Sequence, residues 1–252
     1  MSSRARTSIV TGGGTGIGAA CAMALADDSS TVVLVGRRID RLETTAERIR
    51  AAHPACVVLC RSVDVTDVEA VSAFADWVRT DLGAVDVLVN NAGSPQPQID
   101  ADLASVAQAW ETTWRANTLS VVLVTEALIP LIGRPGGRII TIGSFAASLG
   151  TGSPAYASAK AALQTYAVTL SRALGPEGIT ANVVAPGYTA GTELLEGRIT
   201  PERHERLVSA TASRRAGTPE EIASLVAYLA SPDAGYVSGQ TIIANGGTYL
   251  PG

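Results

Sequence analysis

The sequence contains few of the residue types that mark several classes of protein. Aromatic side chains make up 4% of its 252 residues, which argues against a surface on which nucleic-acid bases stack. The formal net charge is -4 and there is no basic run, so nucleic acid is not an expected partner.

Cysteine and histidine are also scarce, and their positions do not suggest a metal centre or a disulfide framework. Cys21, Cys56 and Cys60 are odd in number and form no CxxC pair, so we expect free thiols in a reducing compartment. His53 is close to Cys56, but the intervening Pro54 indicates a helix end and not a ligand loop. We therefore expect no metal site.

Long apolar runs are missing as well. The N-terminal segment MSSRARTSIVTGG has no extended apolar core of the kind that a signal peptide needs. The longest apolar stretches, such as VVLVTEALIPLI, are too short and too interrupted to span a bilayer. We expect no membrane partner and a cytoplasmic location.

The sequence does contain a regular alternation of short β-branched runs and longer helical patterns. The runs have the continuous apolar character of strands buried on both faces of a parallel sheet. Strands are predicted at 7–10, 31–35, 56–60, 85–90, 137–142, 179–184 and 240–245, and helices at 16–27, 40–52, 67–81, 103–132, 155–174 and 219–230. This order predicts an α/β fold, a Rossmann-like doubly wound parallel sheet with helices on both faces.

No linker or repeat divides the chain, so residues 1–252 are predicted to form one dinucleotide-binding and catalytic domain. One segment breaks the alternation. Residues 187–217 insert polar, helical sequence between the sixth strand and the next helix, and this insert is longer than an ordinary connection. A flap over a substrate site and a plain surface excursion are both compatible with it.

The first predicted strand is followed by the glycine-rich stretch TGGGTGIG, residues 11–18. Glycine lets the backbone approach a ligand closely. In a doubly wound fold, a dinucleotide pyrophosphate lies at this turn, against the free N–H groups of the helix N-terminus. Gly14, Gly16 and Ala19 fit the form of the dinucleotide fingerprint that ends in alanine. A flexible turn is the alternative for this stretch taken alone.

The pattern Thr11-Gly12-x-x-x-Gly16-x-Gly18 resembles the cofactor loop of the classical short-chain dehydrogenase/reductase family. Other motifs of that family follow in its order: NNAG at 90–93, Asn117, Ser144 in TIGS, Tyr156 and Lys160 in YASAK, PG at 186–187, and SGQTIIANGG at 238–247. The resemblance covers nearly the whole chain, and within the family it is to 3-oxoacyl-thioester reductases and related ketoreductases.

The sequence departs from the family's pattern in two loops. The interval from Ser144 to Tyr156 is one residue shorter than in many relatives. PGYTAGT is one residue longer than the usual PG-x-x-x-T, so either Thr189 or Thr192 could take the role of the cofactor-binding threonine. Both departures affect the shape of the pocket more than its chemistry.

The resemblance implies catalytic roles for Asn117, Ser144, Tyr156 and Lys160. Ser144 would hydrogen-bond the substrate oxygen, where negative charge develops, and a kink around Asn117 would hold a proton-relaying water. Tyr156 and Lys160 are four apart on a predicted helix, so both project from one face. We expect the ammonium to lower the pKa of the phenol from its free value of about 10, which would allow proton exchange near neutral pH. Taken alone, each residue also has an ordinary structural interpretation.

The resemblance also implies a set of cofactor contacts: Gly12, Gly14, Thr15, Gly16, Ile17, Gly18, Arg37, Arg38, Asp64, Val65, Asn91, Ala92, Gly93, Tyr156, Lys160, Pro186, Gly187 and Thr189. NAD-dependent enzymes usually place an acidic residue at the end of the second strand. Here Gly36 is followed by Arg37 and Arg38, which suit a 2′-phosphate, whereas Asp40 comes later and is predicted to cap the next helix. NADP(H) is therefore the favoured cofactor, and NAD(H) is possible. The alternative for Arg37 and Arg38 is that both are merely solvated.

We predict an NADPH-dependent reductase that converts a ketone to a secondary alcohol, with a 3-oxoacyl thioester or polyketide-like substrate. One alternative is an NAD(P)-dependent dehydrogenase that oxidises a sugar, steroid or other secondary alcohol. Another is a non-catalytic, cofactor-binding regulatory protein. The resemblance further implies a homotetramer with the long fourth and fifth helices at an interface. Trp110 and Trp114, also four apart, are interpreted as packing or as part of a subunit interface.

Overall fold

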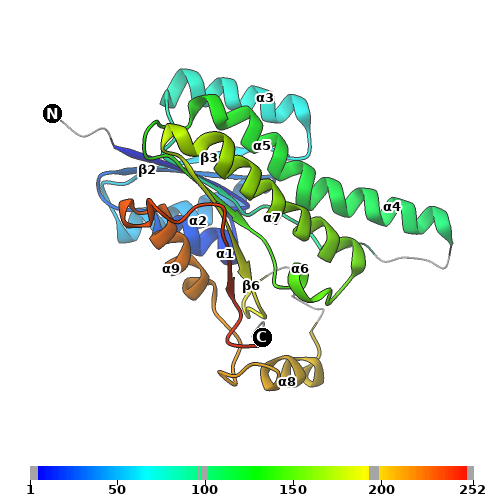
Figure 1. Cartoon of the computed structure of the whole chain (residues 1–252). Helices are drawn as coiled ribbons and strands as arrows, with labels where there is room; N and C mark the ends of the chain where they lie inside the picture. The colour runs from blue at the N-terminus through cyan, green and yellow to red at the C-terminus, as the bar shows by residue number, and fades with distance from the viewer. Residues whose placement is uncertain (1–4, 96, 98–101, 193–198, 249–252) are drawn as a thin grey trace.

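Seven parallel strands form one sheet at the centre of the computed structural model, which describes residues 5–95, 97, 102–192 and 199–248 (Figure 1). The strand order is β3-β2-β1-β4-β5-β6-β7. The strands are β1 (Arg6–Thr11), β2 (Ser30–Gly36), β3 (Val57–Ser62), β4 (Val87–Asn90), β5 (Arg138–Ile142), β6 (Thr180–Pro186) and β7 (Thr241–Ala244). The predicted seven-stranded parallel sheet is thus confirmed.

Helices cover both faces of the sheet (Figure 1). They are α1 (Gly16–Ala24), α2 (Ile39–Ala52), α3 (Val68–Trp77), α4 (Leu103–Trp114), α5 (Ser120–Leu128), α6 (Ala146–Leu149), α7 (Pro154–Leu174), α8 (Pro201–Ser209) and α9 (Pro219–Ala230). Across the described ranges, none of them is long and apolar enough to cross a bilayer.

Alternating side chains of the strands build the two hydrophobic cores. Ile9 pairs in register with Val33 and Leu88, and these residues belong to the core beneath α3, α5 and α7. The next residue, Val10, pairs with Leu34 on β2 and belongs to the core beneath α1, α2 and α9. Because successive strand residues point to opposite faces, a strand covered on both sides is apolar throughout, which is the pattern that the sequence shows.

The helices differ from the prediction in several respects, of which three affect the site and its surroundings. The stretch predicted as one helix over 103–132 is divided into α4 and α5 by a π-helical turn, Arg115–Leu119. Helix α6 was not predicted. The expected cap at Asp40 was wrong: α2 already begins at Ile39, after the extended residue Arg38, and Asp40 lies inside the first turn. Its carboxylate still lies at the positive end of the helix dipole.

The sheet brings the sequence motifs to one edge. Strand β1 pairs with both β2 and β4, so the direction of strand addition reverses beside β1. Open α/β sheets form their ligand crevice outside the carboxyl ends of the strands at such a switch point. The glycine-rich stretch follows β1, and NNAG, TIGS and PG come at the ends of β4, β5 and β6.

The insert, residues 187–217, extends from this edge and carries α8, which lies apart from the helical layers in Figure 1. None of the α8 residues is buried. An isolated parallel bridge between Thr189 and Gly217 joins the two ends of the insert.

Candidate active site

Residues 11–18, which we call the glycine cradle, are packed too closely for side chains at several positions. Gly12 and Gly16 have positive φ angles of 64° and 53°, which favour glycine. A Cβ atom at Gly18, in the first turn of α1, would overlap the carbonyl oxygen of Gly12. The first N–H groups of an α-helix have no partner within the helix, so the start of α1 offers donors to a phosphate at the cradle.

The NNAG motif holds one side of the cradle. Asn91 Nδ2 donates hydrogen bonds to the carbonyl oxygens of Thr11 (3.0 Å) and Gly12 (3.2 Å). Thr11 Oγ1 accepts from the backbone N–H groups of Asn91 (2.9 Å) and Ala92 (3.1 Å). The ends of β1 and β4 are therefore fixed to each other. Thr11 was quoted in the sequence motif but was not among the predicted site residues.

Helix α2 holds the other side of the cradle. The buried side chain of Thr45 donates from Oγ1 to the carbonyl oxygen of Gly14 at 3.1 Å. Arg41, one turn earlier, packs so closely that a Cβ atom at Gly14 would lie 3.0 Å from its own Cβ. Sequence reasoning missed both residues, because an ordinary amphipathic helix pattern gives no sign that they contact the cradle.

The predicted adenosine-side residues lie at the ends of β2 and β3. Arg37 and Arg38 are exposed after the last residue of β2. Asp64 accepts hydrogen bonds from the backbone N–H (2.9 Å) and hydroxyl (2.7 Å) of Thr66, and Val65 lies in the same turn. The backbone hydrogen bond from Thr66 is the main cause that lowers the pKa of Asp64, and the charge of Arg37 contributes less.

Ser144, Tyr156 and Lys160 are brought together as predicted. Helix α7 starts at Pro154 behind the N-cap Ser153, which accepts from the Tyr156 N–H at 3.3 Å. Lys160 Nζ lies 5.9 Å from the ring centroid of Tyr156, and Ser144 hydrogen-bonds the Tyr156 side chain. Ser144 Oγ also accepts from the N–H of Ala146 (3.2 Å), so it serves as a turn cap too.

The expected lowering of the pKa of Tyr156 was wrong for the chain without ligands. Burial raises the pKa of Tyr156, and the hydrogen bond from Ser144 only partly opposes this shift. The Lys160 ammonium lies 5.9 Å from the centre of the Tyr156 ring and donates instead to the carbonyl oxygen of Ile142 (2.9 Å). Burial lowers the pKa of Lys160 to about 8.

Asn117 lies in the π-helical turn between α4 and α5 and is fully buried. Its Nδ2 donates to the carbonyl oxygens of Ser94 (2.9 Å) and Thr113 (3.0 Å), and its Oδ1 accepts from the Ser94 N–H (3.3 Å). The helix is therefore interrupted at Asn117 by a π-helical turn, and such turns are frequent at functional sites. The proton-relaying water stays a prediction.

Gly93 connects the cofactor motif to the catalytic group. A Cβ atom there would lie 2.8 Å from Asn117 Oδ1 and 3.5 Å from Lys160 Nζ. The chain leaving NNAG thus runs directly past both side chains. The segment SPQPQ that follows, residues 94–98, is predicted from its small and polar residues to line the substrate pocket, and its Gln96 and Gln98 lie outside the described residues.

The two threonines of PGYTAGT occupy different environments. Thr189 is buried, bridges to Gly217 and donates from Oγ1 to the carbonyl oxygen of Gly187 (3.3 Å). Thr192 lies against the start of α1, where a Cβ atom at Gly16 would be 3.6 Å from it. The geometry favours Thr192 as the threonine that faces the cradle.

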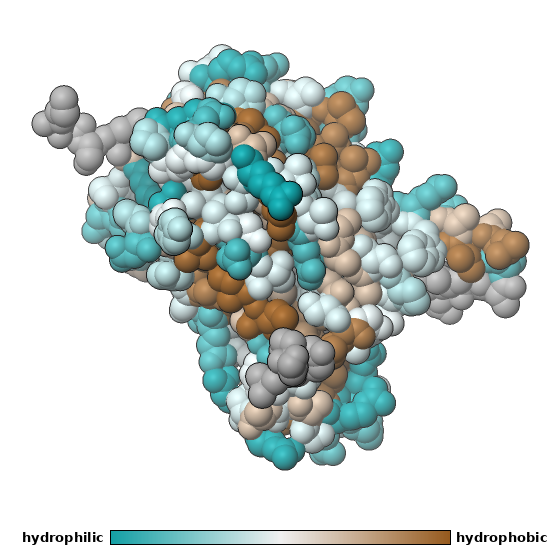
Figure 2. All heavy atoms as spheres, viewed as in Figure 1, coloured by the Kyte–Doolittle hydropathy of each residue, from teal (hydrophilic) through white to brown (hydrophobic). Residues whose placement is uncertain are grey.

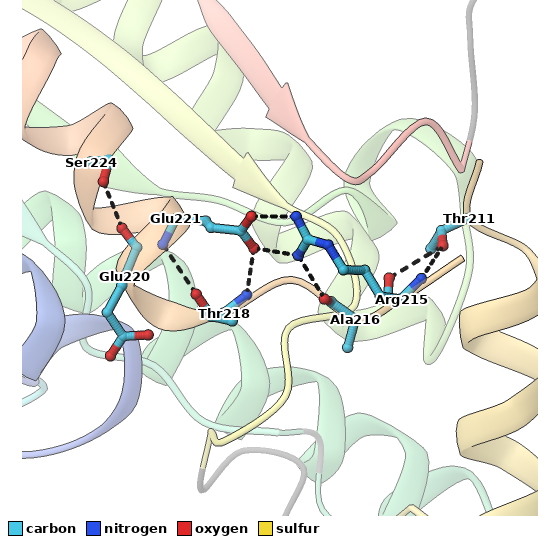
Figure 3. A network of polar contacts seen from close by, with 7 residues as sticks. All are labelled: Thr211, Arg215, Ala216, Thr218, Glu220, Glu221 and Ser224. Atoms are coloured by element: carbon cyan, nitrogen blue, oxygen red, sulfur yellow. Dashed lines mark hydrogen bonds and ion pairs between the residues drawn. The ribbon is translucent and has the colours of Figure 1, made fainter. Parts of the chain in front are cut away.

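The C-terminal end of the insert is held by a network of polar contacts at α9 (Figure 3). The Arg215 guanidinium binds both carboxylate oxygens of Glu221, with Nη1–Oε2 at 2.8 Å. Glu221 also accepts from the Thr218 N–H (3.0 Å) in a capping box, and the bond with Arg215 is the main cause that lowers its pKa to about 2. At the other end of the insert, the Tyr188 hydroxyl lies 2.7 Å from His204 Nδ1 on α8.

The three cysteines are free thiols, of which Cys21 and Cys56 are buried and Cys60 is half-buried. Burial raises the pKa of Cys21 and of Cys60 to about 12, so neither is a reactive thiolate near neutral pH. Among the described residues, no group of three or more His, Cys, Asp or Glu side chains is arranged to hold a metal ion.

Comparison with known proteins agrees with this geometry. The family profile described as enoyl-(acyl carrier protein) reductase matches residues 12–249. The 3-oxoacyl-[acyl-carrier-protein] reductase of Escherichia coli (strain K12) is 32% identical, over 99% of this chain and 100% of the relative. The 7α-hydroxysteroid dehydrogenase of the same organism is 34% identical, over 96% of this chain and 93% of the relative.

Solved structures of similar proteins include complexes with either nicotinamide cofactor. A short-chain dehydrogenase from Burkholderia cenocepacia J2315 in complex with NADP is 31% identical with a TM-score of 0.85, covering 96% of this chain and 97% of that one. A 7α-hydroxysteroid dehydrogenase complexed with NADH and 7-oxo glycochenodeoxycholic acid is 31% identical with a TM-score of 0.86, covering 96% of this chain and 93% of that one.

Proposed function

The chain belongs to the short-chain dehydrogenase/reductase family, whose members matched here are oxidoreductases of CH–OH and C=O groups, and we propose that it reduces a ketone to a secondary alcohol with NADPH. The observation that carries the proposal is the assembly of Ser144, Tyr156 and Lys160 at the edge of the sheet that also carries the glycine cradle. The likeness to a 3-oxoacyl-[acyl-carrier-protein] reductase supports a 3-oxoacyl thioester or a polyketide-like substrate.

The residues at the carboxyl edge of the sheet fit a dinucleotide. The crowded glycines and the start of α1 suit its pyrophosphate, and we add Thr192 to the predicted contacts on the strength of its position against Gly16. Arg37 and Arg38 suit a 2′-phosphate, whereas the turn with Asp64 and Val65 suits the adenine. When bound, the cofactor would supply the hydride.

The proton chemistry of the site favours reduction. Burial raises the pKa of Tyr156, so the phenol keeps its proton at neutral pH and is ready to donate it to a substrate oxygen that gains negative charge. Ser144 would donate a second hydrogen bond to that oxygen. The Lys160 ammonium, on the same face of α7, would stabilise the phenolate that remains. We propose Asn117 as the fourth catalytic residue, whose π-helical turn would hold a water that relays protons.

The proposal is tested by following NADPH oxidation by absorbance with an acetoacetyl thioester, with NADH in parallel. We expect turnover with NADPH that falls at least about 100-fold in Tyr156→Phe. Turnover that persists in this variant would overturn the role of Tyr156. A wild-type preference for NADH would overturn the choice of cofactor.

A second candidate is the oxidation of a secondary alcohol, and the likeness to a 7α-hydroxysteroid dehydrogenase favours it. It predicts that NADP⁺ or NAD⁺ is reduced with a steroid or sugar alcohol while the acetoacetyl thioester gives no turnover. A regulatory protein without turnover is opposed by the complete set of Ser144, Tyr156 and Lys160. Unchanged biological function in Tyr156→Phe would favour that regulatory protein.

We further propose that the insert acts as a flap over the substrate. Its support is that α8 has no buried residue and that the insert is tied at its ends. Hydrogen exchange over the described part of residues 188–215 should slow when NADPH binds, and equal exchange with and without NADPH would contradict the flap.

We propose a homotetramer with the predicted fourth helix, which the structure divides into α4 and α5, and the predicted fifth helix, α7, at one subunit interface. The protruding end of α4 carries hydrophobic side chains in Figure 2, and Trp110 and Trp114 expose 40% and 45% of their surface, so packing within the chain does not account for them. Light scattering after size-exclusion chromatography should give four times the chain mass, and Trp114→Glu should lower it.

A further inference from the structure

Arg41 is a positively charged residue beside the glycine cradle, and it is not among the predicted cofactor contacts. It lies in the first turn of α2, and its Cβ packs against Gly14 of the cradle. Helix α2 begins directly after β2, at the position where dinucleotide enzymes bind the adenosine ribose. Arg41 is therefore on the ribose side of the cradle, whereas α1 starts on the pyrophosphate side.

A groove of about 490 Å³ between α1, α2 and α9 ends at the cradle. Gly14, Thr15 and Gly16 line its end, and the α2 wall carries Arg41 and Arg48. The two arginines are seven residues apart on one helix face, so only Arg41 is level with the cradle. Arg48 lines the same groove about 10 Å farther along the helix, from the rise of 1.5 Å per residue.

The Arg41 side chain can change partners at little cost. It is 53% exposed, and its Nε lies 3.9 Å from Asp40 Oδ2, too far for a hydrogen bond. Asp40 is the only ion-pair partner that Arg41 has among the described residues. An exposed pair of this kind contributes little, so a phosphate dianion would compete with it easily.

From this arrangement we propose that Arg41 binds the 2′-phosphate of NADPH together with Arg37 and Arg38, and thereby helps the protein to discriminate against NADH. This inference rests on the proposed function. Arg37 and Arg38 approach from the end of β2, whereas Arg41 approaches from the side of Gly14 and Thr15. A guanidinium fork on that side would hold phosphate oxygens that the other two do not reach. The positive end of the α2 dipole adds to the same attraction.

The test is the equilibrium binding of NADPH and of NADH to the full chain, measured by fluorescence at one ionic strength. We expect Arg41→Ala to weaken NADPH binding about tenfold and NADH binding less than about twofold. Arg41→Lys keeps the charge but not the fork, so an intermediate loss is expected. Arg48→Ala removes the same charge from the same helix face and should change neither affinity by more than about twofold.

Each other outcome overturns a defined part of the inference. An equal loss for both cofactors in Arg41→Ala would place Arg41 on their shared pyrophosphate. An equal effect of Arg41→Ala and Arg48→Ala would reduce the role to general electrostatics. If Arg41→Ala leaves the affinity for NADPH unchanged while Arg37→Ala lowers it, the role of Arg41 is rejected and that of Arg37 is kept. Tighter binding of NADH than of NADPH by the wild type would instead reject the proposed cofactor on which the inference depends.

Discussion

The glycine cradle and the insert border the same edge of the sheet, and they are held in different ways. The cradle is fixed from two sides by buried or half-buried hydrogen bonds, from Asn91 on one strand end and from Thr45 on α2. The insert is tied at its two ends, and α8 between them has no buried residue. A site that accepts one cofactor needs rigid donors, whereas loops can vary with the substrate.

The largest expected effect comes from breaking the cradle with Gly18→Ala. The new Cβ would overlap the carbonyl oxygen of Gly12, and both groups belong to packed backbone that cannot move aside easily. We expect a loss of about 2–4 kcal/mol in the free energy of unfolding, measured by denaturant titration, and no detectable NADPH binding.

Gly175→Ala is the matched control for Gly18→Ala. Gly175 has an ordinary helical φ of -56° and nothing within 4 Å of a Cβ atom, so cofactor binding should be unchanged. A Gly18→Ala variant that behaves like this control would show that the cradle is looser than the structure indicates.

The comparison also explains what could be predicted from the sequence. The seven strands of the parallel sheet and the positions of Ser144, Tyr156 and Lys160 follow from local patterns and a known motif. Thr45 could not be predicted, because its contact with Gly14 joins residues that are far apart in sequence. The raised pKa of Tyr156 depends on burial, which a four-residue spacing does not determine.

The second prediction concerns the buried charge of Lys160, which lies next to Gly93. Burial lowers the pKa of Lys160 from its ordinary value to about 8, so the folded chain is penalised for holding the ammonium. Between pH 8 and the ordinary pKa of lysine, the unfolded chain binds more protons than the folded chain, so the stability of the wild type rises with pH. Lys160→Met should therefore raise the free energy of unfolding at pH 7, by up to about 3 kcal/mol.

The gain in stability of Lys160→Met should shrink as the pH rises from 8 to 10, because Lys160 of the wild type is then neutral in the folded chain and no charge has to be buried. The lost hydrogen bond to the carbonyl of Ile142 offsets about 1 kcal/mol of it. Thermal unfolding at several pH values measures the difference. A variant less stable than the wild type at every pH would show that Lys160 is a structural requirement of the cradle.

Thr45→Val should loosen the cradle without a steric clash. It leaves the Gly14 carbonyl oxygen without the hydrogen bond from Thr45, at a cost of about 1 kcal/mol. Because Gly14 belongs to the part of the site that NADPH and NADH would share, both dissociation constants should rise together, by about fivefold. Thr44→Val, on the exposed neighbouring residue, is the control and should leave both unchanged.

The smallest effect is expected where the insert joins α9. Glu221→Gln removes the charge that binds Arg215 but keeps an oxygen for the capping box with Thr218, so α9 should start unchanged. Exposed ion pairs contribute little to global stability, so the melting temperature should not move. The local effect should be faster hydrogen exchange at residues 211–217, by about twofold to fivefold, with unaltered cofactor affinity.

The pH dependence distinguishes this ion pair from a general loosening of the insert. The pKa of Glu221 is lowered to about 2, so the pair contributes at ordinary pH and is lost only as the pH falls toward that value. The exchange difference between wild type and Glu221→Gln should therefore persist from pH 8 down to pH 5. If the difference disappears by pH 5, another group controls the junction, and the Tyr188–His204 contact becomes the next one to test. If cofactor affinity falls together with faster exchange, the insert is coupled to the cradle, and the two regions are less independent than their packing implies.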